Sequence, residues 1–155
     1  MLFRSIGAGS GQFALQVIQS LSSDHENINH YFILEISPSL RKQQYELLTK
    51  NLPSHLFSKI QWIDEIPKEY EGIIFCNEFL DALPVELIKK DSGMYYQKGI
   101  GIENDLLVWK EKPIDDISNY EEIDLRNLPD DYVAEYPLYI KNWLKKISQS
   151  LNKGI

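Results

Sequence analysis

Residues 3–12, FRSIGAGSGQ, decide how the rest of the chain is interpreted. They begin as a short apolar strand, pass through Gly7, Gly9 and Gly11, and continue directly into an amphipathic helix. Glycines at such a junction allow a sharp turn and let a ligand approach bare backbone amides at the positive end of a helix. A plain connector between a strand and a helix uses the same residues, so the loop alone leaves both interpretations open.

Strand-like and helix-like segments alternate through the first half of the chain. The strands are continuous apolar runs, which is typical of strands buried on both faces, and a Ser-Pro pair at residues 37–38 supplies a helix cap. This alternation predicts an α/β fold with a parallel sheet and right-handed crossovers. The predicted strands are residues 2–6, 31–34, 60–63 and 72–76, and the predicted helices are residues 11–21 and 38–51.

The pattern changes after Pro84. Three strand-like runs separated by turn residues predict an antiparallel meander, which we interpret as an insertion. An acidic, aperiodic segment follows and is predicted to be a solvated loop. The chain then ends in an amphipathic helix, with Gly154 at the expected C′ cap. We expect a core at residues 1–84 and the insertion at 85–112, with strands at 85–90, 94–102 and 106–111. Residues 113–155 are expected to hold the acidic loop (113–131) and a C-terminal helix of the same domain as the core.

The composition argues against several classes of protein. The chain has 155 residues, enough for one domain, and a net charge of −7 without a long basic run, which disfavours a nucleic-acid partner. No apolar stretch is long enough to span a bilayer and no secretory signal is recognisable, so no membrane insertion is expected. The single Cys76 fits a reducing compartment, and His25, His30 and His55 lack the spacing of metal ligands, so no metal site is expected.

Glu35 is the first candidate side chain for ligand binding. It directly follows the second predicted strand. In a parallel βαβ unit that position lies beside the glycine loop, where a carboxylate can accept hydrogen bonds from both hydroxyls of a ribose. A strand-end acid that faces solvent is the alternative. Together with the glycine loop, Glu35 favours a nucleoside ligand.

The second informative stretch is residues 77–84, NEFLDALP, directly after the fourth predicted strand. Ligands of open α/β sheets bind at this carboxyl edge. Asn77, Glu78 and Asp81 would be costly to bury there without a partner, and a guanidinium matches a carboxylate with two donors at a time. The alternative is helix capping, with Asn77 as the N-cap and Glu78 in the first turn.

These pieces together resemble the MidA family of class I S-adenosylmethionine-dependent methyltransferases. The matching residues are the glycine loop, the stretch LEISPSLR at 34–41 with Gln44, then Trp62, and NEFLDALPV at 77–85. Their order and spacing match the family over nearly the whole chain. The resemblance implies a Rossmann-like methyltransferase sheet of parallel strands flanked by helices.

The resemblance also implies roles for individual residues. The cofactor would be S-adenosylmethionine, held by Gly7, Ala8, Gly9, Ser10, Gly11, Glu35, Ile36, Asn77 and Glu78. Glu35 would hold the ribose, and Glu78 would line the pocket near the sulfonium. Asp81 is our own candidate for a guanidinium partner, which makes Glu78 and Asp81 the expected catalytic residues. The methyl acceptor would be an arginine of a protein, in the mitochondrial members a respiratory complex I subunit.

Two departures from the family pattern carry expectations of their own. Ser5 stands where the family usually has an acid that helps to fix the loop and the amino group of the cofactor, so weaker cofactor binding is expected. Relative to the family, the chain is expected to be truncated at both ends. We therefore expect an incomplete sheet that lacks its fifth parallel strand and exposes an apolar edge.

The expected function is an S-adenosylmethionine-dependent protein arginine methyltransferase, or the cofactor-binding fragment of one. The alternative is a non-catalytic nucleoside- or protein-binding module derived from that family. A nicotinamide dehydrogenase is disfavoured because Gln12 occupies the place of the third glycine in G-x-G-x-x-G. We expect the protein in a bacterial cytoplasm, with the mitochondrial matrix as the alternative, and homo-oligomer formation stays open.

Overall fold

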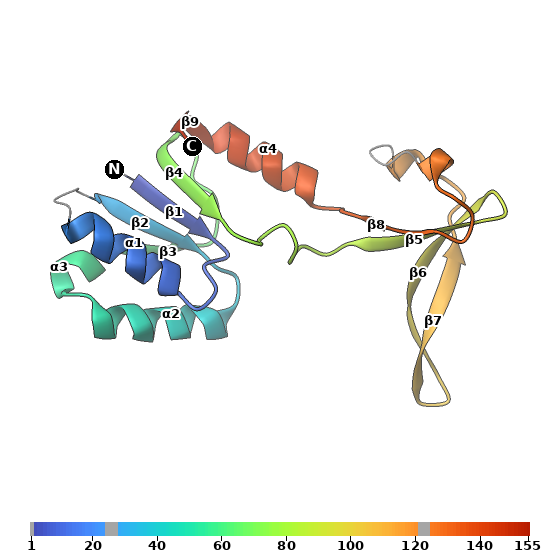
Figure 1. Cartoon of the computed structure of the whole chain (residues 1–155), viewed down its shortest axis with the longest axis horizontal. Coiled ribbons are helices and arrows are strands. Elements are labelled where there is room, and N and C mark those ends of the chain that lie inside the picture. Colours follow the sequence, from blue (N-terminus) through green and yellow to red (C-terminus); the bar gives the residue numbers. More distant parts are fainter. Residues whose placement is uncertain (1, 24–27, 121–124) are drawn as a thin grey trace. The chain divides into compact units, whose positions relative to one another are not determined.

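The computed structural model describes residues 2–23, 28–120 and 125–155, which form two compact units. The first unit comprises residues 1–82 and 142–155, and the second comprises residues 83–141. Figure 1 labels the helices and strands along the chain.

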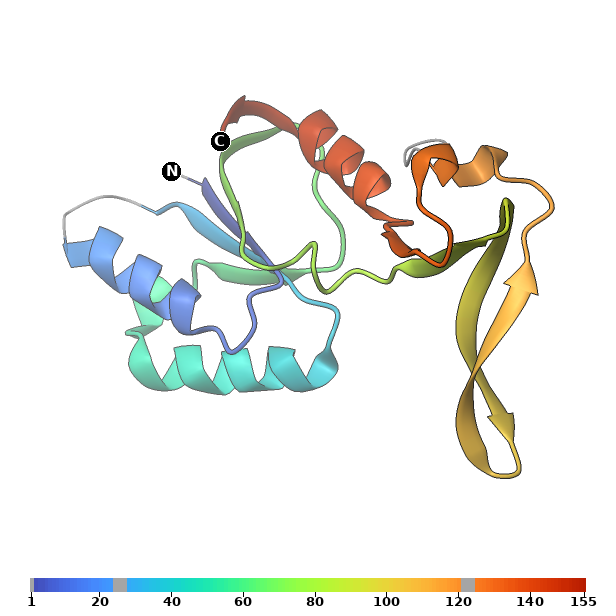
Figure 2. The same cartoon turned by 45° about the vertical axis from the view of Figure 1, so that its right-hand side comes forward.

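The first unit contains a five-stranded parallel sheet in the order β3-β2-β1-β4-β9. This arrangement confirms the predicted α/β class. Helices α1 and α2 cover one face of the sheet and α4 lies on the other, as right-handed crossovers in opposite directions require (Figures 1 and 2). The elements are β1 (Leu2–Ile6), α1 (Gln12–Ser23), β2 (His30–Leu34), α2 (Pro38–Asn51), α3 (Ser54–Phe57), β3 (Ile60–Ile63), β4 (Tyr70–Cys76), α4 (Ile140–Ser150) and β9 (Leu151–Gly154).

The core of this unit lies between the sheet and its two N-terminal helices. Tyr31 and Ile33 of β2 are fully buried there against Ala14 of α1 and Leu48 of α2. The predicted cap of α2 is present, since the Ser37 side chain accepts a hydrogen bond from the Leu40 amide at 3.4 Å. Packing of apolar helix faces on the first three strands therefore fixes where the carboxyl ends of those strands meet.

The fifth strand, which the sequence analysis expected to be missing, is formed by the last residues of the chain. Strand β9 pairs in parallel with β4, and the Ile155 amide donates to the Gly72 carbonyl oxygen at 3.2 Å. Helix α4 ends at Ser150, so the predicted C′ cap at Gly154 is wrong. Gly154 instead has a φ of +139° within the strand, where a Cβ would collide with the Gly72 backbone. The amphipathic pattern predicted the helix well but did not reveal that pairing with β4 would end it.

The second unit is built on a four-stranded antiparallel sheet in the order β7-β6-β5-β8. Its first three strands confirm the predicted meander, and β8 adds a strand that was not predicted. The tight turns use left-handed residues, Ser92 and Gly93 in one hairpin and Asn104 and Asp105 in the other, as two-residue hairpin loops require. The elements are β5 (Glu86–Asp91), β6 (Met94–Glu103), β7 (Leu106–Pro113), η1 (Ser118–Tyr120), η2 (Leu125–Asn127) and β8 (Val133–Tyr136).

The acidic segment at residues 113–131 is not the solvated loop that was predicted. Its Leu125 is 2% exposed and forms a small core with Ile88 of β5 and Tyr136 of β8, against which Ile114 and Leu128 also pack. The prediction failed because these apolar residues are widely spaced in an acidic background and follow neither a helical nor a strand period. Residues 121–124 of the segment lie outside the described residues.

Arg4 is an unusual feature of the first unit because it is a fully buried cation in the central strand β1. Its guanidinium carbon lies 3.9 Å from the centre of the Tyr70 ring. Within the described residues, none of its three side-chain nitrogens has a hydrogen-bond partner. Burial accordingly lowers the pKa of the Arg4 guanidinium. A buried charge without a partner is destabilising.

We predict that Arg4→Met stabilises the protein. Replacing an unpaired buried charge with an apolar side chain of similar length should raise the free energy of unfolding by about 1 to 4 kcal/mol, measured by chemical denaturation. Arg126→Met, at an exposed position, is the control and should stay within about 0.5 kcal/mol of the wild type. A loss of stability in Arg4→Met would contradict the prediction and show that the contact of the guanidinium with the Tyr70 ring outweighs the cost of burying the charge.

Candidate functional site

The glycine loop between β1 and α1 turns through three left-handed backbone positions. The φ angles of Gly7, Gly9 and Gly11 are +67°, +54° and +86°. The Gly7 amide donates to the carbonyl oxygen of Leu34 at 3.0 Å, and the Gly11 amide donates to that of Ala8 at 3.0 Å. The start of the loop is therefore hydrogen-bonded to the last residue of β2. Its end forms a turn within the loop immediately before α1. Glycine adopts these angles without the steric cost that other residues meet.

The three glycines differ in what surrounds them. A Cβ added to Gly7 would lie 3.2 Å from Cδ2 of Phe79, and one added to Gly11 would lie 3.1 Å from Cγ of Gln44. A Cβ added to Gly9 would meet nothing within 4 Å. The loop is thus packed against protein at both ends and is open in the middle, where a ligand can approach the backbone.

Glu35 lies beside this loop, as predicted, and it does not face solvent. Its side chain is 6% exposed, and Oε1 accepts a hydrogen bond from the Ser37 amide at 3.0 Å. Oε2 accepts one from Nε2 of Gln44 at 3.4 Å, and the same Nε2 donates to the Gly9 carbonyl oxygen at 2.8 Å. The amide of Gln44 therefore connects the acid to the open part of the loop. The next residue, Ile36, is 87% exposed.

Arg41 joins the carboxyl ends of two neighbouring strands. Its Nε donates to the carbonyl oxygen of Glu35, and its Nη2 donates to that of Ile63 at 3.0 Å and forms an ion pair with Asp64 at 2.6 Å. This fixes the end of β2 relative to the end of β3. Arg41 and Gln44 belong to the stretch that resembles the family, but their contacts were not predicted. A signal was present, because residues 41, 44 and 48 are spaced to share one face of α2 and Leu48 is in the core.

The polar segment after β4 is a series of turns, so the predicted alternative of a helix capped by Asn77 is wrong. Asn77, Glu78 and Asp81 are all exposed, which also removes the expected need for a partner to offset their burial. Glu78 has a φ of +51°, a conformation that non-glycine residues rarely adopt and that is often found at functional sites. Tertiary contacts rather than a helical turn hold this segment.

Phe79 anchors the polar segment to the glycine loop. One edge of its ring lies against Gly7, and the ring also meets Trp143 of α4 edge-on with centroids 4.9 Å apart. Asn77 and Glu78 are therefore carried to the loop side of the sheet. Within the described part of the chain, no hydrogen bond or ion pair connects Glu78 or Asp81 to Glu35 or to the loop.

Ser5 occupies the position where an acid was expected, and its side chain points into the core. It is 2% exposed, and its Oγ lies 2.8 Å from the hydroxyl oxygen of Tyr31. Burial raises the pKa of Tyr31 to about 12, so this hydroxyl stays protonated at neutral pH. Ser5 thus contributes to the packing under the loop, and its hydroxyl is engaged away from any ligand.

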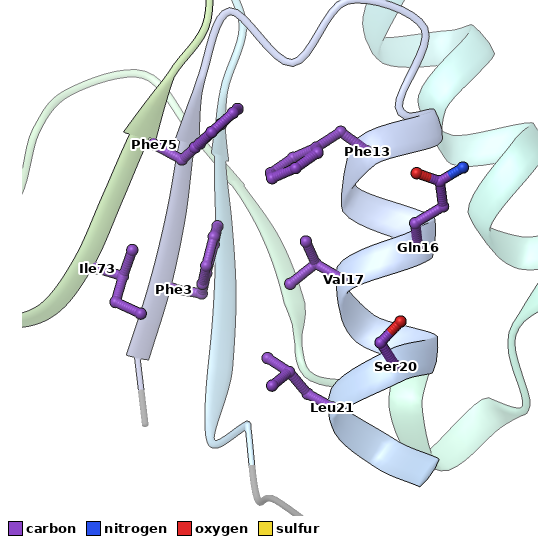
Figure 3. Close-up of a pocket in the computed structure, with 8 residues that line it drawn as sticks. All are labelled: Phe3, Phe13, Gln16, Val17, Ser20, Leu21, Ile73 and Phe75. Carbon is purple, nitrogen blue, oxygen red and sulfur yellow. The ribbon is translucent and has the colours of Figure 1, made fainter. Parts of the chain in front are cut away.

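A pocket of about 470 Å³ lies between α1 and the sheet, and it is lined mainly by apolar side chains. Figure 3 shows Phe13, Val17 and Leu21 of α1 facing Phe3, Ile73 and Phe75 of the sheet. Gln16 and Ser20 supply its only polar side chains, and none of its lining residues is charged. This chemistry does not suit a charged nucleoside, so the candidate nucleoside site is the glycine loop.

The described residues contain neither a cluster of metal ligands nor a membrane-spanning helix. No three His, Cys, Asp or Glu side chains gather there as a group that could hold a metal ion; His25 lies outside the described part. Of the helices in that part, none combines the length and apolarity needed to cross a membrane.

Comparison with known proteins identifies the family. A family model described as "Putative S-adenosyl-L-methionine-dependent methyltransferase" matches residues 4–155. The chain belongs to this family. The predicted resemblance to S-adenosylmethionine-dependent methyltransferases is thereby confirmed at the level of the family. No curated protein matches the chain.

Two crystal structures of proteins from Burkholderia thailandensis share the fold. One is an uncharacterized superfamily protein, with a TM-score of 0.86 and 25% identity over 97% of this chain and 40% of that one. The other, from the same superfamily, is described as a "likely methyl transferase" bound to S-adenosyl-homocysteine; its TM-score is 0.84, with 25% identity over 97% of this chain and 39% of that one. This member of the family thus spans about two fifths of the length of these relatives.

The geometry of the loop predicts unequal effects of alanine at two of its glycines. Gly9→Ala should lower the free energy of unfolding by about 1 to 2 kcal/mol, the usual cost of a left-handed residue. Gly11→Ala should cost more, because its Cβ also presses on Gln44 at 3.1 Å. Chemical denaturation of the two variants measures the difference, and equal losses would show that Gln44 moves aside freely.

Proposed function

We propose that this chain binds S-adenosylmethionine at the glycine loop and is the cofactor-binding part of a protein arginine N-methyltransferase. The observation that carries the proposal is the connection through Gln44 between Glu35 and the open backbone of Gly9. This connection supports the proposal because a carboxylate beside open backbone can accept hydrogen bonds from a ribose while the backbone receives the rest of the cofactor. The family assignment supports the same ligand.

In this proposal, different residues of the site bind different parts of the cofactor. Glu35 accepts hydrogen bonds from the ribose hydroxyls, and the exposed side chain of Ile36 offers an apolar surface for the base. Residues 7–11 and the first amides of α1 receive the methionine part, because the N-terminus of a helix favours a carboxylate. Asn77 and Glu78 line the pocket near the sulfonium. When bound, the cofactor supplies an activated methyl group.

The proposed acceptor is an arginine side chain of a protein, such as a subunit of respiratory complex I. Glu78 and Asp81 follow β4 on the loop side of the sheet and are open to a partner. A carboxylate there can orient a guanidinium through paired hydrogen bonds and take up the proton that the nitrogen loses. Orientation of this kind supplies most of what the protein must add to an already activated donor.

A second candidate is a non-catalytic module that binds the nucleoside or a protein partner. It is favoured by Ser5, whose side chain is engaged with Tyr31.

Calorimetric titration with S-adenosylmethionine tests the cofactor site. We expect binding by the wild type and a loss of about tenfold or more in Glu35→Gln, because hydrogen bonds to a charged acceptor contribute about 1.5 to 3 kcal/mol. Glu46→Gln, an exposed position on α2, is the matched control and should bind like the wild type. NADH should not bind. A folded wild type that gives no heat with S-adenosylmethionine would refute the cofactor proposal.

A methyl-transfer assay on arginine-containing peptides separates the two candidate functions. We expect Asp81→Asn to lower turnover by about 10²-fold or more while leaving the affinity for the cofactor unchanged, because a general acid–base group typically contributes about 10²- to 10⁴-fold. Asp115→Asn, exposed in the second unit, is the control. Cofactor binding without any transfer would support the non-catalytic module.

A further inference from the structure

Gln44 is a buried amide whose donors are both used. Its side chain is fully buried, and the two hydrogens of Nε2 are directed to the Gly9 carbonyl oxygen at 2.8 Å and to Oε2 of Glu35 at 3.4 Å. Its Oε1 accepts a hydrogen bond from Nε1 of Trp62 at 2.9 Å. Each partner comes from a different part of the fold: the glycine loop, the end of β2, and β3.

Trp62 determines which way the amide of Gln44 faces. An indole nitrogen is a donor only, so it must meet the amide oxygen. The amide nitrogen is then directed to the other side, toward Gly9 and Glu35. The opposite orientation would place two donors together at Trp62 and set an amide oxygen against two further oxygens. Buried polar groups that are fully paired in this way hold one geometry.

The contacts of Glu35 leave its carboxylate able to accept further hydrogen bonds. Oε1 accepts from the Ser37 amide and Oε2 accepts from Gln44. Each carboxylate oxygen has about two acceptor positions, so one position remains on each. Two free acceptors on one carboxylate match the two hydroxyls of a ribose cis-diol.

We propose that Gln44 is a positioning residue, which holds Glu35 and the Gly9 turn together so that the site selects nucleosides with an intact 2′,3′-diol. This inference rests on the proposed cofactor site. The simpler alternative is that Gln44 only fills space, since its Cγ also packs close to Gly11. A space-filling role predicts a change in stability but no change in selectivity for the diol.

Calorimetry with S-adenosyl-homocysteine and its 2′,3′-dideoxy analogue distinguishes these roles. The wild type should prefer the intact diol. In Gln44→Leu the affinity for S-adenosyl-homocysteine should fall about tenfold or more, because Glu35 and the Gly9 turn lose the amide that holds them in place for the ligand, and the preference for the diol should shrink. Gln43→Leu makes the same change at the neighbouring, exposed position of α2 and should alter neither value.

A double-mutant cycle with Glu35→Gln provides a second readout. If Gln44 acts through Glu35, then Gln44→Leu should cost much less affinity in the Glu35→Gln background than in the wild type. If Gln44→Leu fails to fold, Gln44→Met replaces it. That variant keeps an unbranched side chain of similar length, loses both donors without adding a charge, and should bind S-adenosyl-homocysteine about tenfold more weakly than the wild type.

The outcomes that overturn each proposal differ. A wild type that binds no S-adenosyl-homocysteine overturns the cofactor site, and the role of Gln44 falls with it. A wild type that prefers the diol, together with a Gln44 variant that keeps the same preference, overturns the positioning role alone. Additive effects of the two substitutions would also overturn it.

Discussion

The candidate site depends on one constraint, which is that the backbone between β1 and α1 must pass through three left-handed positions within five residues. The turn brings the start of a helix directly over the end of the central strand and leaves the Gly9 backbone open. Its beginning is bonded to the end of β2 through the Gly7 amide. Glu35 directly follows Leu34, the last residue of β2, so its position follows from this connection. The same backbone therefore creates an approach for a ligand and places an acid beside it.

Packing around the loop explains how a flexible sequence holds one shape. Gly7 is backed by Phe79, which follows β4, and Gly11 by Gln44 of α2, so both ends of the loop rest on side chains from other elements. Phe79 in turn contacts Trp143, and Gln44 is fixed by Trp62. Trp143 of α4 thus supports the start of the loop through Phe79, and Trp62 of β3 supports its end through Gln44. Glycine loses more conformational entropy on folding than other residues do. The contacts of the folded loop offset this loss.

The chemical character of the site differs between its two sides. Glu35 is buried and held by two donors, which suits a fixed ligand such as a ribose. Glu78 and Asp81 are exposed, which suits a partner that arrives from solution and leaves again. The apolar pocket on the α1 face has neither property, and its lining continues the aromatic packing of Phe3, Phe13 and Phe75. In the proposed function, the buried acid serves the cofactor and the exposed acids serve the acceptor, which is a transfer between a resident donor and a mobile substrate.

The sequence by itself determined that the first four strands are parallel, that a glycine loop joins the first of them to a helix, that Glu35 lies near this loop and that a meander follows. These features could be predicted because hydrophobic period and turn chemistry are local properties. Tertiary structure alone decided the features that depend on residues far apart. These include the pairing of β9 with β4, the burial of Leu125 within an acidic segment and the turns that replace a helix after Asn77. The three partners of Gln44 belong to this group as well. No local pattern encodes them, because a hydrogen bond between distant segments exists only once the packing of the strands has brought its donor and acceptor together.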